Sequence, residues 1–285
     1  MSGAPNFDAF GASAQTFFHD GLAQSYTELG DGDPVLLLHG YPTWSYDWVD
    51  VMPALADAHR VVAPDWIGYG LSDKPARHVR VGEQIDRLEA LLEHLEVDRF
   101  HLVAHDYGAT CAQDMLSRPE LAARVLSLTL MNGGVVYEAY RPTRTQKLLL
   151  TPLGPLLSRF LGEARLRAKL DAVRGHKLTD AQWRAQWAGM SAKDGVWKSH
   201  LLQRYINERT EHHQRWEAAV RKYSGPVQLI WGPEDPVSGA HVLAPLREQL
   251  PEARVVELPA IGHFVPDEAP DAVAEAILEF TQCNP

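Results

Sequence analysis

The stretch that most constrains this chain is a tight turn between a strand-like and a helix-like segment. Residues 100–103 form a short apolar run typical of a buried strand, and residues 109–116 have the character of a helix. Between them, Ala104 and Gly108 place small side chains two residues before and two residues after Asp106. A sharp strand-to-helix turn accepts only small flanking side chains and lifts the central side chain above the sheet. The pattern predicts an elbow that presents Asp106.

An aspartate at such an elbow suits a particular kind of chemistry. A carboxylate that attacked an ester would form a labile anhydride. Attack on a saturated carbon, such as an epoxide carbon or a carbon bearing a halide, forms an alkyl ester that water can cleave. Asp106 is therefore a candidate nucleophile. The alternative is an ordinary surface acid in a strand–helix turn, and the residues that accompany it decide between the two.

Composition limits the class of protein further. The chain has 285 residues, 45% of them hydrophobic, which is enough for one large α/β domain with an inserted subdomain. The formal net charge is −10, so nucleic acid is not an expected partner and an anionic membrane surface is not favoured. The two cysteines, Cys111 and Cys283, support neither a disulfide framework nor a cysteine metal site. We expect no metal and no cofactor.

No segment resembles a targeting or membrane-spanning sequence. Residues 1–6 lack the basic stretch and apolar core of a secretory signal. Residues 148–155 are apolar, but the stretch is broken by prolines and falls short of the ~18 residues that cross a bilayer. We therefore expect a cytoplasmic protein.

Short apolar runs alternate with helical patterns along most of the chain. After an expected edge hairpin at residues 13–29, runs that predict strands occupy residues 35–38, 61–63, 100–103, 125–131, 227–231 and 254–258. Helical spacing is expected at residues 45–58, 81–95, 109–116, 241–249 and 271–282. This alternation predicts an α/β fold with a mostly parallel sheet covered by helices on both faces.

The alternation stops between Gly133 and Gly225. This stretch is rich in helical patterns and holds four of the eight tryptophans. We divide the chain into a core, residues 1–132 and 226–285, and an inserted helical cap, residues 133–225. The cap would cover the carboxyl ends of the strands, where ligands bind in open α/β sheets. The alternative is a second packing layer that does not touch substrate, because aromatic residues at helical spacing are more often core.

Residues after later strands complete a hydrolytic set with Asp106. His263 follows the last strand, and its neutral form can take a proton from water. Asp235 follows the preceding strand and would orient the histidine, with the adjacent Glu234 as the fallback. Asn132 ends an earlier strand, but its uncharged amide would stabilise an imidazolium less well. Asn132 is at least as well explained by hydrogen bonds to the backbone.

Hydrolysis of an ester on Asp106 also needs donors for the developing negative charge. The elbow geometry assigns one backbone N–H to Tyr107 and the other to Tyr41, in the loop after the first buried strand. His39 would order that loop. His105 would be packed and hydrogen-bonded in the sheet, because strand alternation directs it away from the pocket.

These motifs together resemble a known family. The order nucleophile, acid, histidine resembles the α/β-hydrolase superfamily, and the likeness extends over nearly the whole chain. Within it, the chain looks similar to the branch with an aspartate nucleophile, the epoxide hydrolases and haloalkane dehalogenases. The matching motifs are His39-Gly40-Tyr41-Pro42, Asp65-x-x-Gly68-x-Gly70-x-Ser72-Asp73, His105-Asp106-Tyr107-Gly108, Trp231-Gly232-x-x-Asp235 and Gly262-His263-Phe264. Two further stretches, Asn132-Gly133-Gly134 and Tyr205-Ile206-Asn207, are similar to the epoxide-hydrolase-like mesoderm-specific-transcript proteins.

The resemblance implies two reactions and the donors that each requires. Dehalogenases usually hold the halide with a tryptophan right after the nucleophile and an asparagine after the His-Gly pair, or a second tryptophan elsewhere. Here Tyr107 and Tyr41 stand at those two positions. Epoxide hydrolases usually protonate the departing oxygen with two cap tyrosines. Tyr205 is the best candidate and Tyr137 the next, although either ring could equally line a wall.

We therefore expect an epoxide hydrolase that forms a covalent ester on Asp106 and releases a diol. His263 and Asp235 would activate the hydrolytic water. The alternatives are a haloalkane dehalogenase with the same triad and a degenerate hydrolase fold that acts as a binding protein. The expected partners are a small apolar substrate and water, and a homodimer is left open.

Overall fold

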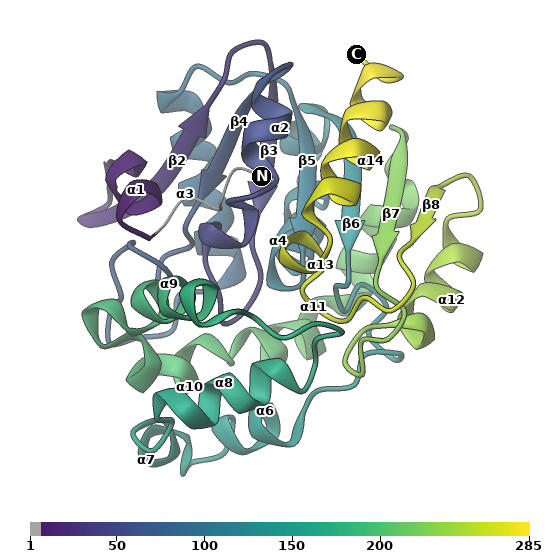
Figure 1. Ribbon diagram of the computed structural model, residues 1–285. Helices are drawn as coiled ribbons and strands as arrows, with labels where there is room; N and C mark the ends of the chain where they lie inside the picture. The colour runs from purple at the N-terminus through teal and green to yellow at the C-terminus, as the bar shows by residue number, and fades with distance from the viewer. Residues whose placement is uncertain (1–6) are drawn as a thin grey trace.

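The computed structural model describes residues 7–285, so residues 1–6, where we expect no secretory signal, lie outside the described part. The strands form one eight-stranded sheet in the order β1-β2-β4-β3-β5-β6-β7-β8 (Figure 1). The strands are β1 (Gln15–His19), β2 (Leu22–Leu29), β3 (Asp33–Leu38), β4 (His59–Pro64), β5 (Phe100–His105), β6 (Val125–Met131), β7 (Val227–Trp231) and β8 (Arg254–Glu257).

The sheet is antiparallel at one edge and parallel elsewhere. β1 and β2 form the expected hairpin, and β2 continues antiparallel to β4. From β4 across to β8 every neighbouring pair is parallel. The carboxyl ends of β3, β5, β6, β7 and β8 therefore meet at one edge of the sheet, which is where the predicted site residues follow them.

Helices cover both faces of the sheet, as Figure 1 shows. Those of the core are α1 (Phe7–Ser13), η1 (Ser45–Trp48), α2 (Met52–Ala56), α3 (Val81–His94), α4 (Tyr107–Leu116), α5 (Pro119–Ala122), α12 (Ala240–Gln249), α13 (Val265–Glu268) and α14 (Pro270–Gln282). Those between β6 and β7 are α6 (Arg144–Leu149), α7 (Gly154–Ser158), α8 (Glu163–Asp171), α9 (Asp180–Ser191), η2 (Ala192–Lys198), α10 (Ser199–Leu202) and α11 (Tyr205–Lys222).

Two apolar clusters, one on each face, explain why the strands are continuous apolar runs. Leu36 and Leu38 of β3 pack with α3 and α4, whereas Val35 and Leu37 pack with α2 and α14. A strand buried on both faces has no polar side to alternate with. The parallel sheet predicted from the sequence is confirmed.

One expected helix is divided in the structure. The segment predicted as a helix over residues 45–58 forms the 3-10 turn η1 and then the short α2, which has Pro53 in its first turn. Proline lacks a backbone N–H and therefore starts a helix more readily than it continues one. Pro53 therefore starts a separate short helix, although the apolar spacing alone predicts one continuous helix.

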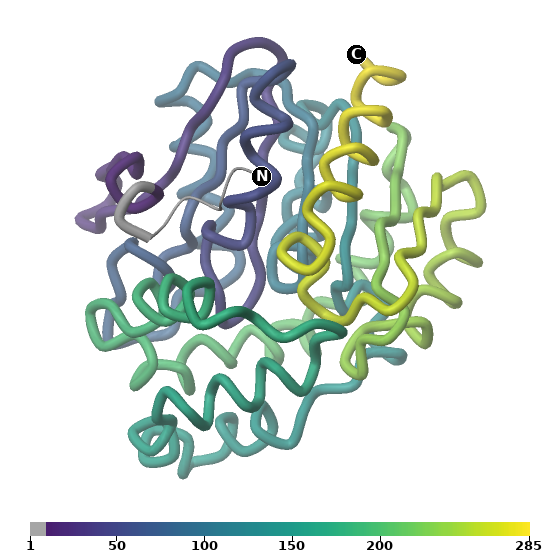
Figure 2. The backbone as a smooth tube through the Cα atoms, in the orientation of Figure 1, coloured from purple at the N-terminus to yellow at the C-terminus, as the bar shows by residue number. Residues whose placement is uncertain are grey.

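The helices α6 to α11 gather at one end of the sheet (Figures 1 and 2). They lie within residues 133–225, and we call them the cap helices. Residues of α6 and α8 line the same cavity as Asp106 and His263. The cap therefore faces the carboxyl ends of the parallel strands. Among the described helices, none combines the length and the apolar character needed to cross a bilayer.

Candidate active site

The elbow has the tight geometry expected from its small residues. Asp106 precedes α4 with a φ of 46° and a ψ of −107°, in a region that residues with a side chain rarely adopt. A Cβ atom at Gly108 would lie 2.3 Å from the carbonyl oxygen of Leu38, so no larger residue fits there. Backbone strain of this kind is held at functional sites by the surrounding structure. Here it lifts Asp106 above the end of β5.

Three side chains from separate loops meet at this edge of the sheet. His263 Nδ1 lies 2.8 Å from Asp235 Oδ2. On the other side of the ring, His263 Nε2 lies 3.8 Å from Asp106 Oδ1. All three residues are buried, with exposed fractions of 6% or less. The arrangement aligns a carboxylate, an imidazole and a second carboxylate, in the chain order Asp106, Asp235, His263.

A cradle of donors fixes Asp235. The carboxylate accepts the N–H groups of Val237 and Ser238, at 2.7 and 3.1 Å, and the Ser238 hydroxyl at 2.8 Å. Asn132 donates to Asp235 Oδ2 at 3.0 Å and also exchanges hydrogen bonds with the backbone of Gly232. Asn132 therefore holds the acid and its loop, in addition to the hydrogen bonds to the backbone that its position predicted. The neighbouring Glu234 is exposed.

The pKa values of the three groups are set by burial and by one another. Burial alone would lower the pKa of His263, but the charges of Asp235 and Asp106 raise it well above its usual value. Burial would raise the pKa of Asp106, yet His263 outweighs that effect and holds the pKa below its usual value. The pKa of Asp235 falls to about 2, since His263 and the hydrogen bonds to the carboxylate overcome burial. The resting site therefore holds an imidazolium between two carboxylates.

The oxyanion loop reaches Asp106 directly. The N–H of Tyr41 donates to Asp106 Oδ2 at 2.9 Å, and within residues 7–285 it is the only backbone N–H hydrogen-bonded to that carboxylate. His39 braces the loop through Gly40 O at 2.8 Å and the Trp66 N–H at 3.2 Å. The other predicted donor, the N–H of Tyr107, begins α4 immediately after Asp106. Its role in the oxyanion hole stays a prediction.

His105 is buried beside the triad but plays a different part. Its Nε2 lies 2.8 Å from the carbonyl oxygen of His263. Burial and the positive charge of His263 lower the pKa of His105 to about 4. The ring is therefore neutral near pH 7 and supports the backbone of the histidine loop, as the packing prediction implies.

A cavity of about 250 Å³ opens above Asp106 and His263. The core contributes Tyr41, Pro42, Val237 and Phe264 to its wall. The cap contributes Thr143, Thr145, Gln146, Leu166, Lys169, Leu170, Ala172 and Val173. The wall is mostly apolar around a few polar groups, which is the usual composition of a small-molecule site.

The two predicted cap tyrosines lie in different environments. Tyr205 begins α11, is 1% exposed, and packs edge-on against Tyr107 with ring centroids 4.8 Å apart. Its hydroxyl meets no hydrogen-bond partner within the described chain, and the negative charge of Asp106 adds to burial in raising its pKa. Tyr137 instead stacks on His213 and bonds Thr210 at 3.0 Å on the exposed side of α11. The structure does not bring Tyr137 to the site.

A third cap tyrosine, Tyr140, is buried beside a residue of the cavity wall. Tyr140 is 9% exposed, and its hydroxyl accepts a hydrogen bond at 3.1 Å from Gln146, a cavity residue. Burial raises the pKa of Tyr140 to about 12, against the lowering effect of Arg209, whose guanidinium lies 4.2 Å from the ring centroid. Tyr140 follows Tyr137 by three residues in an irregular segment, so no periodicity in the sequence distinguishes the buried ring from the exposed one.

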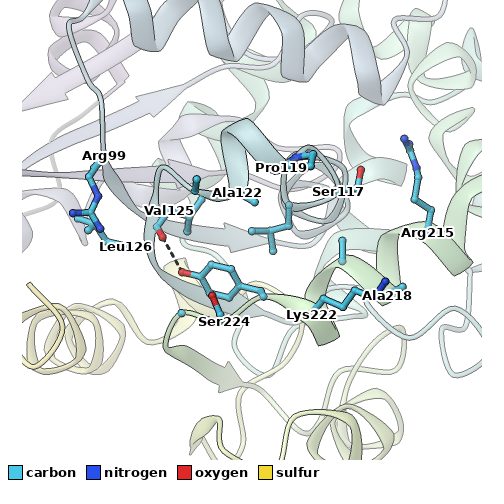
Figure 3. Close-up of a pocket in the computed structure, with 15 residues that line it drawn as sticks. Arg99, Ser117, Pro119, Ala122, Val125, Leu126, Arg215, Ala218, Lys222 and Ser224 are labelled. Atoms are coloured by element: carbon cyan, nitrogen blue, oxygen red, sulfur yellow. Dashed lines mark hydrogen bonds between the residues drawn. The ribbon is translucent and has the colours of Figure 1, made fainter.

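A larger hollow lies elsewhere on the surface (Figure 3). It measures about 870 Å³ and lies between the start of β6 and the end of α11. Its polar rim includes Arg99, Arg215 and Lys222, and its lining contains no histidine, cysteine or carboxylate. The hollow therefore has hydroxyls, such as that of Ser117, but no histidine or carboxylate that could activate them. The smaller cavity at Asp106 has both a histidine and a carboxylate.

Comparison with known proteins agrees with the fold and the site. The sequence matches the alpha/beta hydrolase fold family over residues 33–270. The chain belongs to this family and is a hydrolase of the α/β fold. It is 38% identical over 255 residues to LipZ of Mycobacterium tuberculosis, covering 87% of this chain and 88% of LipZ.

Two further relatives lie in the branch that the motifs resemble. The human mesoderm-specific transcript homolog protein is 34% identical over 295 residues, covering 97% of this chain and 88% of that protein. Haloalkane dehalogenase 2 of Mycobacterium tuberculosis is 31% identical over 268 residues, covering 89% and 90%. Among solved structures, haloalkane dehalogenase DbeA from Bradyrhizobium elkani matches with a TM-score of 0.81 at 27% identity, covering 94% of this chain and 97% of that one. The resemblance read from the motifs is confirmed.

Proposed function

We propose that this hydrolase opens epoxides to diols through a covalent alkyl ester on Asp106. The observation that carries the proposal is a buried carboxylate with a lowered pKa, which faces the His263–Asp235 pair at the base of an apolar cavity. A carboxylate in this state is an ionised nucleophile at neutral pH. Two buried phenols, Tyr205 and Tyr140, lie near enough for the charge of Asp106 to help raise their pKa values, although neither lines the cavity, and they support the epoxide rather than the halide reaction.

In the first step a carboxylate oxygen of Asp106 bonds to an epoxide carbon while the carbon–oxygen bond of the ring breaks. The departing oxygen takes a proton from a phenol. Tyr205 is suited to this because its hydroxyl is buried and unpartnered among the described residues. Tyr140 is the second candidate, and its pKa of about 12 keeps it protonated at neutral pH. A positioned acid of this kind contributes roughly 10²–10⁴-fold in rate.

In the second step the alkylated Asp106 no longer carries its negative charge. One of the two charges that raise the pKa of His263 is then lost, so the imidazolium gives up its proton more readily, and that proton, relayed through water, restores the phenol that lost one in the first step. The neutral ring takes a proton from water, which attacks the carboxyl carbon of the ester. The Tyr41 N–H, already 2.9 Å from Asp106 Oδ2, meets the resulting oxyanion. Collapse expels the alkoxide, which takes a proton from His263 to give the diol. The carboxyl group of Asp106 then returns its own proton to His263, so the carboxylate and the imidazolium are both restored.

Haloalkane dehalogenation is the second candidate because relatives of 31% identity carry that name. A halide needs N–H donors at the cavity. The indole N–H of Trp183 donates to Glu163 at 2.8 Å and that of Trp216 to Asp114 at 2.8 Å. No tryptophan is among the described residues that line the cavity. These observations favour the epoxide.

The third reading, a degenerate fold that only binds, has less support. Its triad would be expected to have lost a member, or its pocket to have closed. A cavity of about 250 Å³ is open beside the nucleophile. Because ligand pockets usually measure roughly 300–1,000 Å³, this one suits a small substrate.

The experiment that tests the proposal traps the ester. His263→Gln leaves Asp106 able to attack but removes the base for hydrolysis, so the alkyl ester accumulates. The variant is treated separately with an aryl epoxide and a bromoalkane, and intact protein mass is recorded. We expect an adduct with the epoxide that disappears when Asp106→Ala is added. An adduct with the bromoalkane alone would favour dehalogenation, and no adduct across a panel of both would contradict the proposal.

A further inference from the structure

Charge is divided unequally between the two parts of the chain. Residues 133–225 contain 17 lysines and arginines against 8 aspartates and glutamates, a net charge of +9. The remaining residues contain 10 against 29, a net charge of −19. The overall value of −10 therefore hides a strongly cationic cap on a strongly anionic core. The local charge of the cap, and not the net charge of the whole chain, decides which surfaces attract the cap.

The cap also carries the exposed apolar side chains. Each of five large residues is between 54% and 62% exposed, and the five are Leu148, Leu153, Leu156, Phe160 and Trp197. Among residues 10–285, Phe18 is the single other large apolar residue with comparable exposure. We call these five residues the outer cap patch. Exposed apolar residues gathered in one region mark a site of interaction, whereas scattered ones need no explanation.

The patch is continuous in space. It spans α6, α7 and η2, and α7 contacts both of the others. Arg159 and Trp197 line one shallow groove of about 260 Å³, although they lie far apart in the sequence. Figure 1 shows α7 at the end of the cap farthest from the sheet. The patch is therefore at an outer extremity of the molecule, where a large flat partner can reach it.

Cations outnumber acids around the patch, where two exposed acids, Glu163 and Asp194, line the groove beside Trp197. Residues 139–162 contain no aspartate or glutamate. Arg141, Arg144, Lys147 and Arg159 lie in this stretch, and all four are exposed. Apolar and aromatic side chains flanked by exposed lysine and arginine are the combination that lies in the surface plane of an anionic bilayer.

We propose that the outer cap patch binds the surface of anionic lipid bilayers. Leu153, Leu156 and Phe160 would enter the boundary between head groups and acyl chains, and Trp197 would sit at head-group level. A second copy of this chain is a poorer occupant, because a two-fold contact would set each cationic rim against itself. The net charge of the chain predicts weak attraction to an anionic membrane, but the cationic cap on an anionic core reverses that prediction for this surface.

The location has a consequence for the cavity. Helix α6 offers Thr145 and Gln146 to the wall of the cavity, while Lys147 and Leu148 of the same helix are exposed. A bilayer at the patch would therefore lie one helix away from the catalytic cavity. Apolar substrates concentrated in that bilayer would be released close to Asp106.

Vesicle flotation with the full chain tests the proposal. The protein is mixed with vesicles of phosphatidylcholine alone or of phosphatidylcholine with phosphatidylserine, and the floated fraction is measured. We expect flotation with the phosphatidylserine vesicles and little with phosphatidylcholine alone. Flotation should fall as salt is added, because exposed charges separated by more than about 10 Å are screened at roughly 0.1 M ionic strength.

Single substitutions separate the two contributions. Lys147→Gln and Arg159→Gln should each weaken partitioning about five-fold, as expected for one cation near an anionic surface. Phe160→Ser should weaken it about ten-fold or more, through loss of a buried aromatic ring. The matched controls are Arg247→Gln and Phe18→Ser, which remove an exposed cation and an exposed phenylalanine from the core. Neither control should change flotation.

Three results would overturn the proposal. They are absence of flotation with the anionic vesicles, flotation that the patch variants leave unchanged, and equal flotation with neutral vesicles in high salt. Sedimentation velocity distinguishes the other occupant. A dimer that Phe160→Ser dissociates, without any binding to vesicles, would make the patch a contact between copies and the membrane proposal wrong. Each substitution replaces an exposed side chain, so loss of folding is not expected to obscure the result.

Discussion

The core and the cap meet at one cavity, and they hold their polar groups in opposite ways. In the core, Asp235 is bound by four donors and His263 is held by Asp235 on one side and by backbone contacts behind it. In the cap, the Tyr205 hydroxyl is buried without a partner in the described residues. Asp235 and His263 therefore have their hydrogen bonds before substrate arrives, whereas the Tyr205 hydroxyl does not.

The difference has an energetic meaning. A buried polar group without a hydrogen bond costs about 1–3 kcal/mol, so it persists only where something else is gained. Preorganised groups in the core stabilise the transition state without rearrangement. We expect the buried hydroxyl of Tyr205 to gain its partner from an oxygen atom of the substrate. On the proposed mechanism the core supplies the nucleophile and the base, and the cap supplies the proton donor.

The largest effect is expected from the nucleophile. Asp106→Ala should lower kcat by roughly 10⁴-fold or more, since loss of the nucleophile removes the covalent route entirely. The thermal midpoint should fall, because Asp106 is one of the two carboxylates that stabilise the buried imidazolium of His263. Turnover of an aryl epoxide and thermal unfolding of the same samples measure both. If Asp106→Ala keeps its activity, Asp106 is not the nucleophile.

The second effect concerns the acid that holds the histidine. Asp235→Asn preserves the shape of the side chain but removes the charge that stabilises the imidazolium, so kcat should fall by roughly 10³–10⁴-fold. Glu234→Gln, at the exposed neighbour, is the matched control and should leave kcat unchanged. Kinetics on both variants decide between the two acids. The reverse pattern would make Glu234 the catalytic acid despite its exposure.

The same residue predicts a pH dependence of stability. The folded pKa of Asp235 is about 2, below the value of about 3.9 for an unfolded aspartate. The stabilisation is therefore fully present above about pH 4 and is lost as pH falls through about 2, and its size is about 2 kcal/mol. Urea unfolding of wild type and Asp235→Asn at several pH values measures the difference. The two curves should converge at the acid end, and a constant gap would contradict the assignment.

The comparison also explains what the sequence could predict. The strand runs, the elbow and the order of Asp106, Asp235 and His263 are readable because each lies at a fixed position after a strand, and parallel pairing brings strand ends together. The same logic fails in the cap, where position in the chain does not determine which side chain faces the cavity. Tyr140 and Tyr137 look alike in sequence. In the folded chain Tyr140 is buried against Arg209, whereas Tyr137 stacks on His213.

Asn132 and the outer cap patch both depend on residues that are distant from one another in the sequence. The hydrogen bonds of Asn132 to Asp235 and Gly232 join loops 100 or more residues apart, so nothing local in the sequence reveals them. The net charge of −10 was used as a single number, and it concealed the cationic cap. In both instances the missing information is which parts of the chain share a surface.

The next prediction concerns the hydroxyl groups of the cap tyrosines. Tyr205→Phe and Tyr140→Phe should each slow the formation of the ester about 10–100-fold, because each removes a hydroxyl that can protonate the departing oxygen. Tyr137→Phe is the matched control and should have no effect, since its hydroxyl bonds Thr210 away from the cavity. Single-turnover formation of the ester in the His263→Gln background isolates this step. A loss confined to Tyr137→Phe would restore the assignment made from the sequence.

The smallest effect is expected where the two regions are joined. The carboxylate of Glu268 accepts the N–H groups of Gly175 and His176 from the cap and of Gly262 and Phe264 from the histidine loop. Glu268→Ala leaves these donors to water or without partners. The free energy of unfolding should fall by about 1–3 kcal/mol, as measured in urea. Glu248→Ala, an exposed acid on α12, is the control and should be close to neutral.

The effect of Glu268→Ala on kcat should be small. His263 is tied to the cap by its own N–H, which donates to Val173 O at 2.9 Å, while its ring is held by Asp235 of the core. If the core alone positions the ring, Glu268→Ala should lower kcat only a few-fold, within roughly 1 kcal/mol of transition-state stabilisation. A loss as large as that of Asp235→Asn would mean that the cap helps to hold the catalytic histidine. The separation between a core that positions the base and a cap that supplies the proton donor would then be wrong at this junction.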